Sequence, residues 1–304
     1  MFKESYITEK SFRCGFFGGD MIWLAKTAGF CFGVKNALEV VENILKNNEK
    51  VCTLGNIINN PVVVENLKKR GVLAINSVFE AKKQEVLVIR SHGVGLKTYE
   101  NIKKLNLKFK DATCPFVRRI QKKVFYESNL KKTILIAGDR NHPEVVGIMG
   151  HCNNKPYVFS SFLELKKLFL KNANLKDLHI FVVAQTTFNT KIWQYCVNFL
   201  KSCCSKLEIF SSICSATKER QNEAEIFSKK SDLAIVIGGK NSSNTKKLYD
   251  ICYKNCKTFF VEDELEFKKI SYNFRKKNVF VTAGASTPNF LICRILNLIV
   301  DKTK

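Results

Sequence analysis

The sequence predicts an α/β protein made of three similar small lobes with mostly parallel sheets. Short apolar runs alternate with segments of helical pattern along the chain, in the order of β–α–β units. The runs are continuously apolar, as expected for parallel strands that are buried on both faces. A third observation is a weak repeat, Cys-x-x-[Val/Thr]-[Lys/Arg], which begins at Cys31, Cys114 and Cys214.

The expected elements have the lengths of ordinary strands and helices. Strands are expected at residues 21–26, 51–54, 86–90, 133–137, 180–184, 233–238, 258–261 and 279–282. Helices follow most of them, and the clearest are expected at residues 34–46, 61–69, 115–131, 162–170, 216–229, 244–253 and 289–300. This order predicts the α/β class.

The repeat predicts how the lobes are arranged. The three cysteines are 83 and 100 residues apart, about one small α/β unit each, and each opens an expected helix. Three such units indicate a pseudo-threefold arrangement in which the cysteines converge on a central point. The predicted division is an N-terminal extension (1–20), lobe 1 (21–112, with the C-terminal segment 292–304), lobe 2 (113–210) and lobe 3 (211–291).

Composition narrows the class of protein. The 304 residues suffice for two or three domains, and 45% are hydrophobic, which favours packed cores. A formal net charge of +23 suits nucleic acid, a phosphorylated metabolite or an acidic protein partner, and a Lys-rich composition bias explains it equally well. The basic residues are dispersed and no nucleic-acid-binding motif occurs, so we expect no nucleic-acid partner.

From the sequence we expect neither an export signal nor a membrane-spanning segment. No apolar run is long enough to span a membrane, and the first twenty residues carry charges instead of a continuous apolar core. Its twelve cysteines do not have the spacing of a disulfide framework. We therefore expect a cytoplasmic protein, not bound to membranes, with reduced or metal-bound thiols.

The three cysteines of the repeat are candidate metal ligands. A helix N-terminus favours the thiolate, which is the form that binds metal. Four cysteines usually hold a [4Fe–4S] cluster, so three would leave one iron open to a substrate. The alternative for each cysteine alone is an inert core residue, because free cysteine is often buried. A zinc site usually has four ligands in paired short spacings, which this repeat lacks.

Polar turns follow five of the expected strands, where α/β sheets bind ligands. They are Ser91-His92-Gly93-Val94, the turn 138–144 that ends in His142-Pro143-Glu144, Gln185-Thr186-Thr187, the turn 239–244 that ends in Ser242-Ser243-Asn244, and the turn 283–288 that contains Ser286. The last two resemble phosphate cradles, although ordinary turn and N-cap chemistry explains such residues as well. Neither matches a nucleotide-binding fingerprint.

Glu144 is the best candidate proton donor. A carboxylic acid that is shielded from water can keep its proton near neutral pH. The alternative is a carboxylate that interacts with a helix dipole, because Glu144 follows a proline at a helix start. His92 and His142 lie on the polar turns, whereas His151 and His179 do not and are expected to be structural.

Taken together, these motifs resemble the LytB/IspH family of 4-hydroxy-3-methylbut-2-enyl diphosphate reductases. The resemblance runs from about Met21 to nearly the end of the chain. Its motifs occur in the family's order: Ala28-Gly-Phe-Cys31-Phe-Gly-Val34, Ser91-His-Gly-Val94, Asp111-Ala-Thr-Cys114-Pro115, His142-Pro-Glu-Val145, Gln185-Thr-Thr187, Ile213-Cys214, Lys240-Asn-Ser-Ser-Asn244 and Thr282-Ala-Gly-Ala-Ser286.

The resemblance implies one [4Fe–4S] cluster per chain, held by Cys31, Cys114 and Cys214. It implies that the substrate's C4 hydroxyl binds the open iron and leaves as water, which gives isopentenyl and dimethylallyl diphosphate in the last step of the non-mevalonate isoprenoid pathway. It makes Glu144 the proton donor, helped by Thr186. The residues that would hold the diphosphate or the substrate hydroxyl are His92, His142, Ser242, Ser243, Asn244 and Ser286. An acidic ferredoxin or flavodoxin would suit the basic surface as electron donor.

One departure from the family pattern affects the diphosphate site. The family usually has histidine in an Ile-His-Asn-Pro turn, and this chain has Ile58-Asn59-Asn60-Pro61. An amide can donate a hydrogen bond but cannot become cationic, so we expect activity with weaker substrate binding. The rival function is an iron–sulfur redox sensor or electron carrier, which would need the cysteines but neither Glu144 nor the Ser242-Ser243-Asn244 turn.

Overall fold

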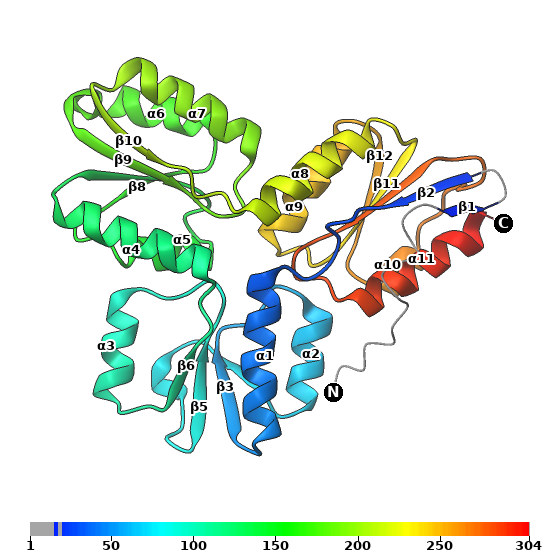
Figure 1. Ribbon diagram of the computed structural model, residues 1–304, viewed down its shortest axis with the longest axis horizontal. Coiled ribbons are helices and arrows are strands. Elements are labelled where there is room, and N and C mark those ends of the chain that lie inside the picture. Colours follow the sequence, from blue (N-terminus) through cyan, green and yellow to red (C-terminus); the bar gives the residue numbers. More distant parts are fainter. Residues whose placement is uncertain (1–14, 18–19, 304) are drawn as a thin grey trace. The chain divides into compact units, whose positions relative to one another are not determined.

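The computed structural model describes residues 15–17 and 20–303, and their contacts divide into two compact units. The first unit comprises the described part of Met1–Lys35 together with Ile58–Arg70 and Ser215–Lys304, and it holds one sheet. The second unit comprises Asn36–Ile57 and Gly71–Cys214, and it holds two sheets. Figure 1 shows the three sheets with their helices.

The sheet of the first unit has five strands in the order β1-β2-β13-β11-β12. The strands are β1 (Gly15–Phe17), β2 (Asp20–Leu24), β11 (Leu233–Ile237), β12 (Lys257–Val261) and β13 (Val279–Ala283). All neighbours pair in parallel except β1, which is antiparallel to β2. The helices of this unit are α2 (Pro61–Lys69), α8 (Ser215–Ser228), α9 (Ser243–Tyr253), α10 (Glu264–Lys268) and α11 (Asn289–Thr303).

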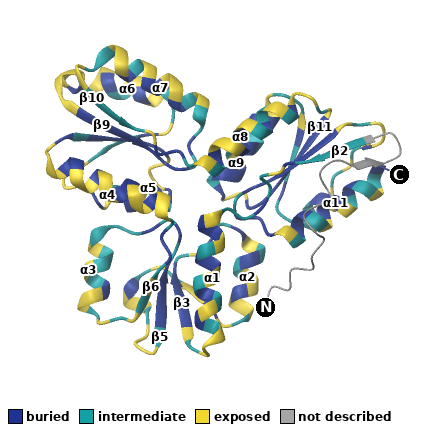
Figure 2. Ribbon diagram, viewed as in Figure 1, coloured by how far each residue is buried: buried dark blue, intermediate teal, exposed yellow. Residues whose placement is uncertain are grey.

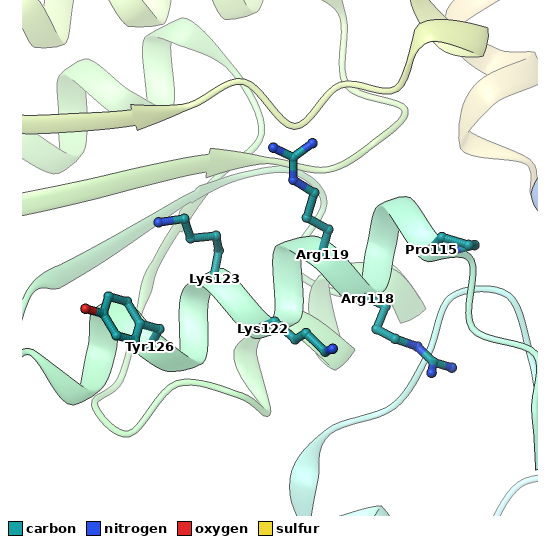
Figure 3. Close-up of a pocket in the computed structure, with 6 residues that line it drawn as sticks. All are labelled: Pro115, Arg118, Arg119, Lys122, Lys123 and Tyr126. Carbon is teal, nitrogen blue, oxygen red and sulfur yellow. The ribbon is translucent and has the colours of Figure 1, made fainter.

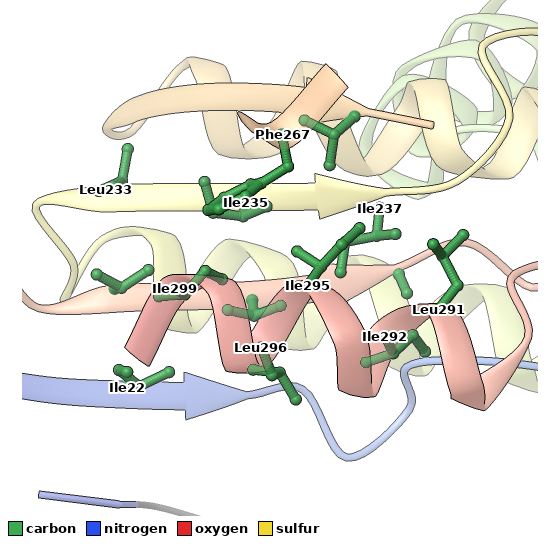
Figure 4. Packing of buried hydrophobic residues seen from close by; sticks show 14 of the residues in the cluster. Ile22, Leu233, Ile235, Ile237, Phe267, Leu291, Ile292, Ile295, Leu296 and Ile299 are labelled. Atoms are coloured by element: carbon green, nitrogen blue, oxygen red, sulfur yellow. The ribbon is translucent and has the colours of Figure 1, made fainter. Parts of the chain in front are cut away.

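Both faces of this sheet are covered by apolar side chains, which explains the unbroken apolar strands. Leu233, Ile235 and Ile237 of β11 pack with Ile295 and Ile299 of α11 on one face (Figure 4). The alternate residues of β11 pack on the other face with residues of α8 and α9. Successive side chains of a strand point to opposite faces, so burial on both faces requires apolar residues throughout.

The second unit contains two four-stranded sheets in which every pair is parallel. The first sheet has the order β4-β3-β5-β6, with β3 (Lys50–Leu54), β4 (Leu73–Ile75), β5 (Glu85–Ile89) and β6 (Phe109–Asp111). The helices close to it in sequence are α1 (Phe32–Lys46), which starts in the first unit, α3 (Leu96–Lys104) and the 3-10 helix η1 (Val78–Glu80).

The other sheet of the second unit has the order β10-β9-β7-β8, with β7 (Thr133–Ala137), β8 (Tyr157–Phe159), β9 (His179–Ala184) and β10 (Lys206–Phe210). Its helices are α4 (Pro115–Asn129), α5 (Pro143–Met149), α6 (Phe162–Lys171), the 3-10 helix η2 (Ala173–Asp177) and α7 (Thr190–Cys203). Central strands are buried and outward helix faces are exposed (Figure 2).

The predicted class of three small α/β lobes with mostly parallel sheets is confirmed. All eight expected strands occur, within two residues of their predicted bounds, and all seven expected helices occur within three. The structure differs in where it places the two ends of the chain. Pairing of β2 with β13 and packing of α11 against the same sheet place both with residues 211–291, not with lobe 1.

This placement has a simple physical cause. The strand at residues 279–283 needs a partner on its open edge, and β2 supplies one, while α11 covers the adjacent apolar face. Of the predicted N-terminal extension, residues 1–14 and 18–19 lie outside the described residues, and Gly15–Phe17 form β1. Within the described chain, no helix combines the length and the hydropathy needed to cross a membrane.

Candidate active site

Each cysteine of the repeat lies at the start of a helix. Cys31 immediately precedes α1, and its carbonyl oxygen accepts a hydrogen bond from the Lys35 amide at 3.0 Å. Cys114 is the N-cap residue of α4, and its carbonyl accepts from the Arg118 amide at 2.9 Å. Cys214 immediately precedes α8. All three side chains are partly exposed, so they can reach a ligand.

Backbone hydrogen bonds hold each of these cysteines to one of the polar turns. The amide of Cys31 donates to the carbonyl of Ala285 at 3.1 Å, that of Cys114 to Ser91 at 3.0 Å, and that of Cys214 to Thr186 at 3.2 Å. The local fold therefore places each cysteine next to a turn that carries candidate substrate-binding residues.

Most other described cysteines are poor metal ligands. Burial raises the pKa of their thiols, which disfavours the thiolate that a metal needs; they are Cys52, Cys152, Cys196, Cys204, Cys252, Cys256 and Cys293. Cys31 belongs to the first unit, whereas Cys114 and Cys214 belong to the second. Among residues 15–17 and 20–303, no three His, Cys, Asp or Glu side chains lie close enough to form a metal-binding group.

Glu144 is a buried carboxyl group in the first turn of α5. Its Oε1 accepts a hydrogen bond from the Thr186 amide at 2.6 Å, and its Oε2 lies 2.7 Å from the Thr186 hydroxyl. Burial raises the pKa of Glu144 to about 7, although the two hydrogen bonds from Thr186 act in the opposite direction. Near neutral pH, a substantial fraction of this carboxyl group therefore carries a proton that it can donate.

The N-cap of α5 fixes the backbone that carries this acid. His142 is the N-cap residue, and its Nδ1 accepts a hydrogen bond from the Glu144 amide at 3.2 Å. Pro143 occupies the first helical position, where its lack of an amide hydrogen costs nothing. The sequence His-Pro-Glu thus begins the helix and turns the carboxyl group toward Thr186.

The imidazole rings of His92 and His142 contact each other edge to face, with 5.1 Å between their centroids. Burial lowers the pKa of His142 to about 4, and the positive charge of Arg90 also lowers it, against an opposing effect of Asp139. Burial, His142 and Arg90 lower the pKa of His92 well below its ordinary value. Both imidazoles are therefore neutral at pH 7 and can bind an anion by hydrogen bonding without carrying charge.

The turn that carries His92 requires its glycine. Gly93 has a φ of +67°, and a Cβ there would lie 2.5 Å from Nε2 of Gln121 and 2.9 Å from Cγ2 of Thr113. The Nδ1 of His92 and the Nε2 of Gln121 are buried without a hydrogen-bond partner in the structure. Such unpaired groups are costly unless a ligand or water pairs with them, so they favour a binding site here.

These contacts form one continuous set within the second unit. From Cys114 it passes through the Ser91-His92 turn to His142, then to Glu144 and Thr186, and from the Thr186 carbonyl to Cys214. Four of the predicted site residues, His92, His142, Glu144 and Thr186, are thus brought together between two candidate cysteine ligands.

The remaining predicted site residues lie in the first unit. Ser242 is the N-cap residue of α9, and its Oγ accepts a hydrogen bond from the Thr245 amide at 3.3 Å. Asn244 lies in the first turn of the same helix. Ser242, Asn244 and Ser286 are buried, and Ser243 is partly buried. Two turns at the carboxyl ends of β11 and β13 thus carry the predicted hydroxyl and amide groups.

Asn59 lies against both of these turns. The hydroxyl of Ser286 donates to the Asn59 carbonyl oxygen at 3.2 Å, and a Cβ at Gly239 would lie 2.5 Å from the same oxygen. Only glycine at position 239 allows the loop before α2 to approach this closely. The backbone of Asn59 is therefore fixed beside Ser286 and the turn that leads to Ser242.

Sequence reasoning missed several residues around these turns. The buried groups Asn60 Nδ2, Asn244 Nδ2, Thr245 Oγ1 and Thr282 Oγ1 have no hydrogen-bond partner in the structure. Asn60 also caps α2, where its Oδ1 accepts from the Val63 amide at 3.2 Å. Its position next to Asn59 was the only signal in the sequence. Unpaired amide hydrogens and hydroxyls at helix starts suit an anionic ligand with several oxygen acceptors.

The two other histidines have structural contacts, as expected. The Nδ1 of His151 lies 2.8 Å from the carbonyl oxygen of Gly147, and the Nε2 of His179 lies 2.8 Å from the carboxylate of Glu208. Neither contact involves the residues described above.

Comparison with known proteins gives a consistent result. A model of the LytB protein family matches residues 22–300. The 4-hydroxy-3-methylbut-2-enyl diphosphate reductase of Caldanaerobacter subterraneus subsp. tengcongensis is 42% identical over 288 residues, which cover 91% of this chain and 96% of that protein. The protein of the same name from Clostridium perfringens strain 13 is 40% identical over 285 residues, with 91% and 98% covered.

Solved structures share the fold. The E-1-hydroxy-2-methyl-but-2-enyl-4-diphosphate reductase of Plasmodium falciparum superimposes with a TM-score of 0.81 at 28% identity, over 91% of this chain and 87% of that one. A solved (E)-4-hydroxy-3-methyl-but-2-enyl diphosphate reductase, described as the terminal enzyme of the non-mevalonate pathway, is 34% identical with a TM-score of 0.66, over 92% and 99%.

Proposed function

This chain belongs to the LytB protein family of iron–sulfur oxidoreductases, and we propose that it reduces 4-hydroxy-3-methylbut-2-enyl diphosphate to isopentenyl and dimethylallyl diphosphate. The reaction breaks the bond between C4 and its hydroxyl oxygen, consumes two electrons and two protons, and releases one water. Relatives of 40% and 42% identity over nearly their full length carry this name, which supports the assignment.

The observation that carries the proposal is the buried Glu144 carboxyl group. A hydroxyl leaves as water only if it receives a proton, and a raised pKa near 7 gives Glu144 that proton at neutral pH. In the structure the Thr186 hydroxyl donates to Oε2 at 2.7 Å. When Oε2 carries the proton, the same contact reverses, and the hydroxyl accepts from Oε2 and passes its own hydrogen onward. The hydrogen bond from the Thr186 amide to Oε1 leaves Oε2 as the protonated oxygen.

Cys31, Cys114 and Cys214 hold one [4Fe–4S] cluster in this proposal. Their places at helix starts and their partial exposure support it, because a helix N-terminus stabilises thiolate. When bound, such a cluster supplies electrons one at a time and offers one iron without a cysteine ligand. The protein's own part is to orient the substrate and to deliver protons.

The diphosphate binds to the hydroxyl, amide and imidazole groups of the polar turns. Ser242, Ser243, Asn244 and Ser286 contribute hydroxyl and amide donors, and the unpaired Nδ2 of Asn60 is added to this predicted set. His92 and His142 contribute as neutral imidazoles. Burial of most of these groups strengthens each hydrogen bond to a charged phosphate oxygen.

The electrons come from an acidic ferredoxin or flavodoxin, which suits a chain of net charge +23. The enzyme works in the cytoplasm. Support for this location comes from the thiols, because none of the eleven described cysteines forms a disulfide, as is usual in a reducing compartment.

The test is anaerobic purification followed by an iron and sulfide count and an assay with a low-potential electron donor. We expect four iron and four sulfide per chain, as in any [4Fe–4S] protein, and both isoprenoid diphosphates as products. A colourless, zinc-containing protein would contradict the cluster. A cluster-containing protein that leaves the diphosphate unchanged would instead support a redox sensor.

A further inference from the structure

The exposed side of α4 carries a concentrated basic surface. An open hollow of about 580 Å³ runs along this helix and is lined by Pro115, Arg118, Arg119, Lys122, Lys123 and Tyr126 (Figure 3). We call the four cations Arg118, Arg119, Lys122 and Lys123 the α4 basic face. Figure 3 shows them in two rows, with Arg119 and Lys123 on one side of the helix and Arg118 and Lys122 on the other.

The helical period explains why the cations gather. Val117, Ile120 and Val124 are buried at spacings of three and four residues and fix one side of α4 against the sheet. The opposite side of the helix faces solvent. It holds the four cations, and the exposed aromatic residues Phe116, Phe125 and Tyr126 lie beside them.

The helix itself does not benefit from this arrangement. Arg118 with Lys122 and Arg119 with Lys123 are like charges four residues apart, which repel. Arg118 and Arg119 also lie in the first turns, where the helix dipole disfavours cations. A partner with negative charge would relieve both effects, so the surface is better suited to binding than to local stability.

Nearby acidic groups neutralise only part of this charge. Arg118 forms a 2.9 Å ion pair with Asp111, and Lys123 forms a 3.1 Å ion pair with Glu127. The guanidinium of Arg119 lies over the ring of Phe210, 5.1 Å from its centroid. Both cations remain more than two-fifths exposed in these pairs, so a partner's carboxylates can reach them.

The α4 basic face begins beside a proposed cluster ligand. Cys114 is the N-cap residue of α4, and Arg118 follows one turn later, about 6 Å along the helix axis. A protein bound over this face would lie near the point where electrons must enter. Exposed aromatic residues and arginine beside it are the residue types enriched in protein–protein interfaces.

We propose that the α4 basic face is the docking site for a small acidic protein electron donor that carries an iron–sulfur cluster or a flavin. This inference rests on the proposed function, because the reaction consumes two electrons per diphosphate. Attraction between opposite charges would steer the donor to this surface and raise its association rate. A nucleic acid would also be attracted by the positive charge. The position beside a proposed cluster ligand favours a redox partner instead.

The test compares two charge reversals of equal size in the cluster-loaded full chain. The first is Arg119→Glu with Lys122→Glu on α4. The matched control is Lys166→Glu with Lys167→Glu on α6, where both residues are exposed and Lys166 lies over the ring of Phe162, 5.3 Å from its centroid. The milder variant Arg119→Gln with Lys122→Gln covers the case in which the first variant fails to fold.

Two electron donors separate docking from chemistry. With a purified acidic ferredoxin, we expect the α4 variants to lose about tenfold or more in kcat/KM for ferredoxin, and the loss to shrink at high salt. With photoreduced deazaflavin, a small neutral donor, we expect wild-type rates. Direct binding of oxidised ferredoxin, measured without turnover, should weaken in the same variants.

Each outcome decides the proposal. Equal losses of kcat/KM in the α4 and α6 variants would overturn it, and so would unchanged ferredoxin binding in the α4 variants. Binding of single-stranded RNA is measured in the same variants. If they lose RNA binding while ferredoxin binding stays intact, the proposal is also wrong. If the wild type fails with deazaflavin but ferredoxin binding still depends on α4, the proposed reaction is wrong and the docking surface remains.

Discussion

The two compact units carry chemically different sets of functional groups. In the second unit, Glu144, Thr186 and the two imidazoles contact one another, and the acid has its hydrogen-bond partners within the protein. In the first unit, the amide nitrogens of Asn60 and Asn244 and the hydroxyls of Thr245 and Thr282 are buried and have no hydrogen-bond partner among the described residues. The first arrangement suits proton transfer, and the second suits an anion that supplies the missing acceptors.

Proton donation and anion binding therefore require opposite arrangements of polar groups in the free protein. A proton donor needs a fixed position and a shifted pKa, which the protein can build completely in advance. An anion site leaves donors unpaired in the free protein, which lowers its stability. The oxygen atoms of the bound anion then pair with these donors. Substitution of Glu144 should therefore change kcat, and substitution of the unpaired donors in the first unit should change substrate affinity.

The largest effect is expected for Glu144→Gln. Glutamine keeps the shape and can still accept from the Thr186 amide, but it carries no acidic proton. We expect kcat to fall about 10²- to 10⁴-fold, with an unchanged Kd for the diphosphate, measured in the deazaflavin assay and by calorimetry. Intact turnover in this variant would show that another group is the acid.

The next largest effect is expected for Asn244→Ala. Loss of one buried hydrogen bond to a charged oxygen, about 1.5–3 kcal/mol, should weaken diphosphate binding about tenfold to a hundredfold while kcat changes little. Calorimetric titration with the diphosphate measures this. Asn198→Ala, an exposed residue of α7, is the control. A fall in kcat at unchanged affinity would mean that Asn244 belongs with the acid.

The pH profile tests the acid without a mutation at the site. Only the protonated carboxyl group can donate, so a pKa of about 7 predicts full activity well below pH 7 and a fall of about tenfold per pH unit well above it. Lowered imidazole pKa values predict no matching transition of His92 or His142 between pH 6 and 8. A profile that rises from pH 6 to 9 would exclude Glu144 as the donor.

The smallest effect is expected for Asn59→His. Its backbone is fixed beside Ser286 and Gly239, so a new imidazole would lie at the edge of the predicted diphosphate site. We expect several-fold tighter binding of the diphosphate, because an imidazole can gain charge beside an anion whereas an amide cannot. Affinity equal to that of the wild type would show that position 59 does not contact the substrate.

The strands show how far a sequence predicts such a fold. All the central strands were predicted, because burial on both faces leaves an unbroken apolar run, as in β11 and β5. The strands that were missed, β1, β4, β6, β8 and β10, are all at sheet edges. Edge strands here are short or partly exposed, so their residues lack a clear apolar pattern; β4, for example, has two exposed residues of three.

The site was less predictable than the fold. Turn positions at strand ends indicated Glu144 and Ser242, but the contact between Glu144 and Thr186 joins residues 42 apart and depends on how two strands pair. Asn60 and Thr245 looked like ordinary cap and helix residues, and only their unpaired buried atoms distinguish them. The neutral state of the histidines also depends on burial that no local pattern reveals.

The most direct test of the division between the units is one experiment on Glu144→Gln and Asn244→Ala, loaded with iron and sulfide and assayed side by side. It measures kcat with photoreduced deazaflavin and Kd for 4-hydroxy-3-methylbut-2-enyl diphosphate. We predict that the first variant binds like the wild type and does not turn over, and that the second turns over like the wild type once saturated. Loss of the same parameter in both variants would contradict the division between a proton donor in the second unit and an anion site in the first.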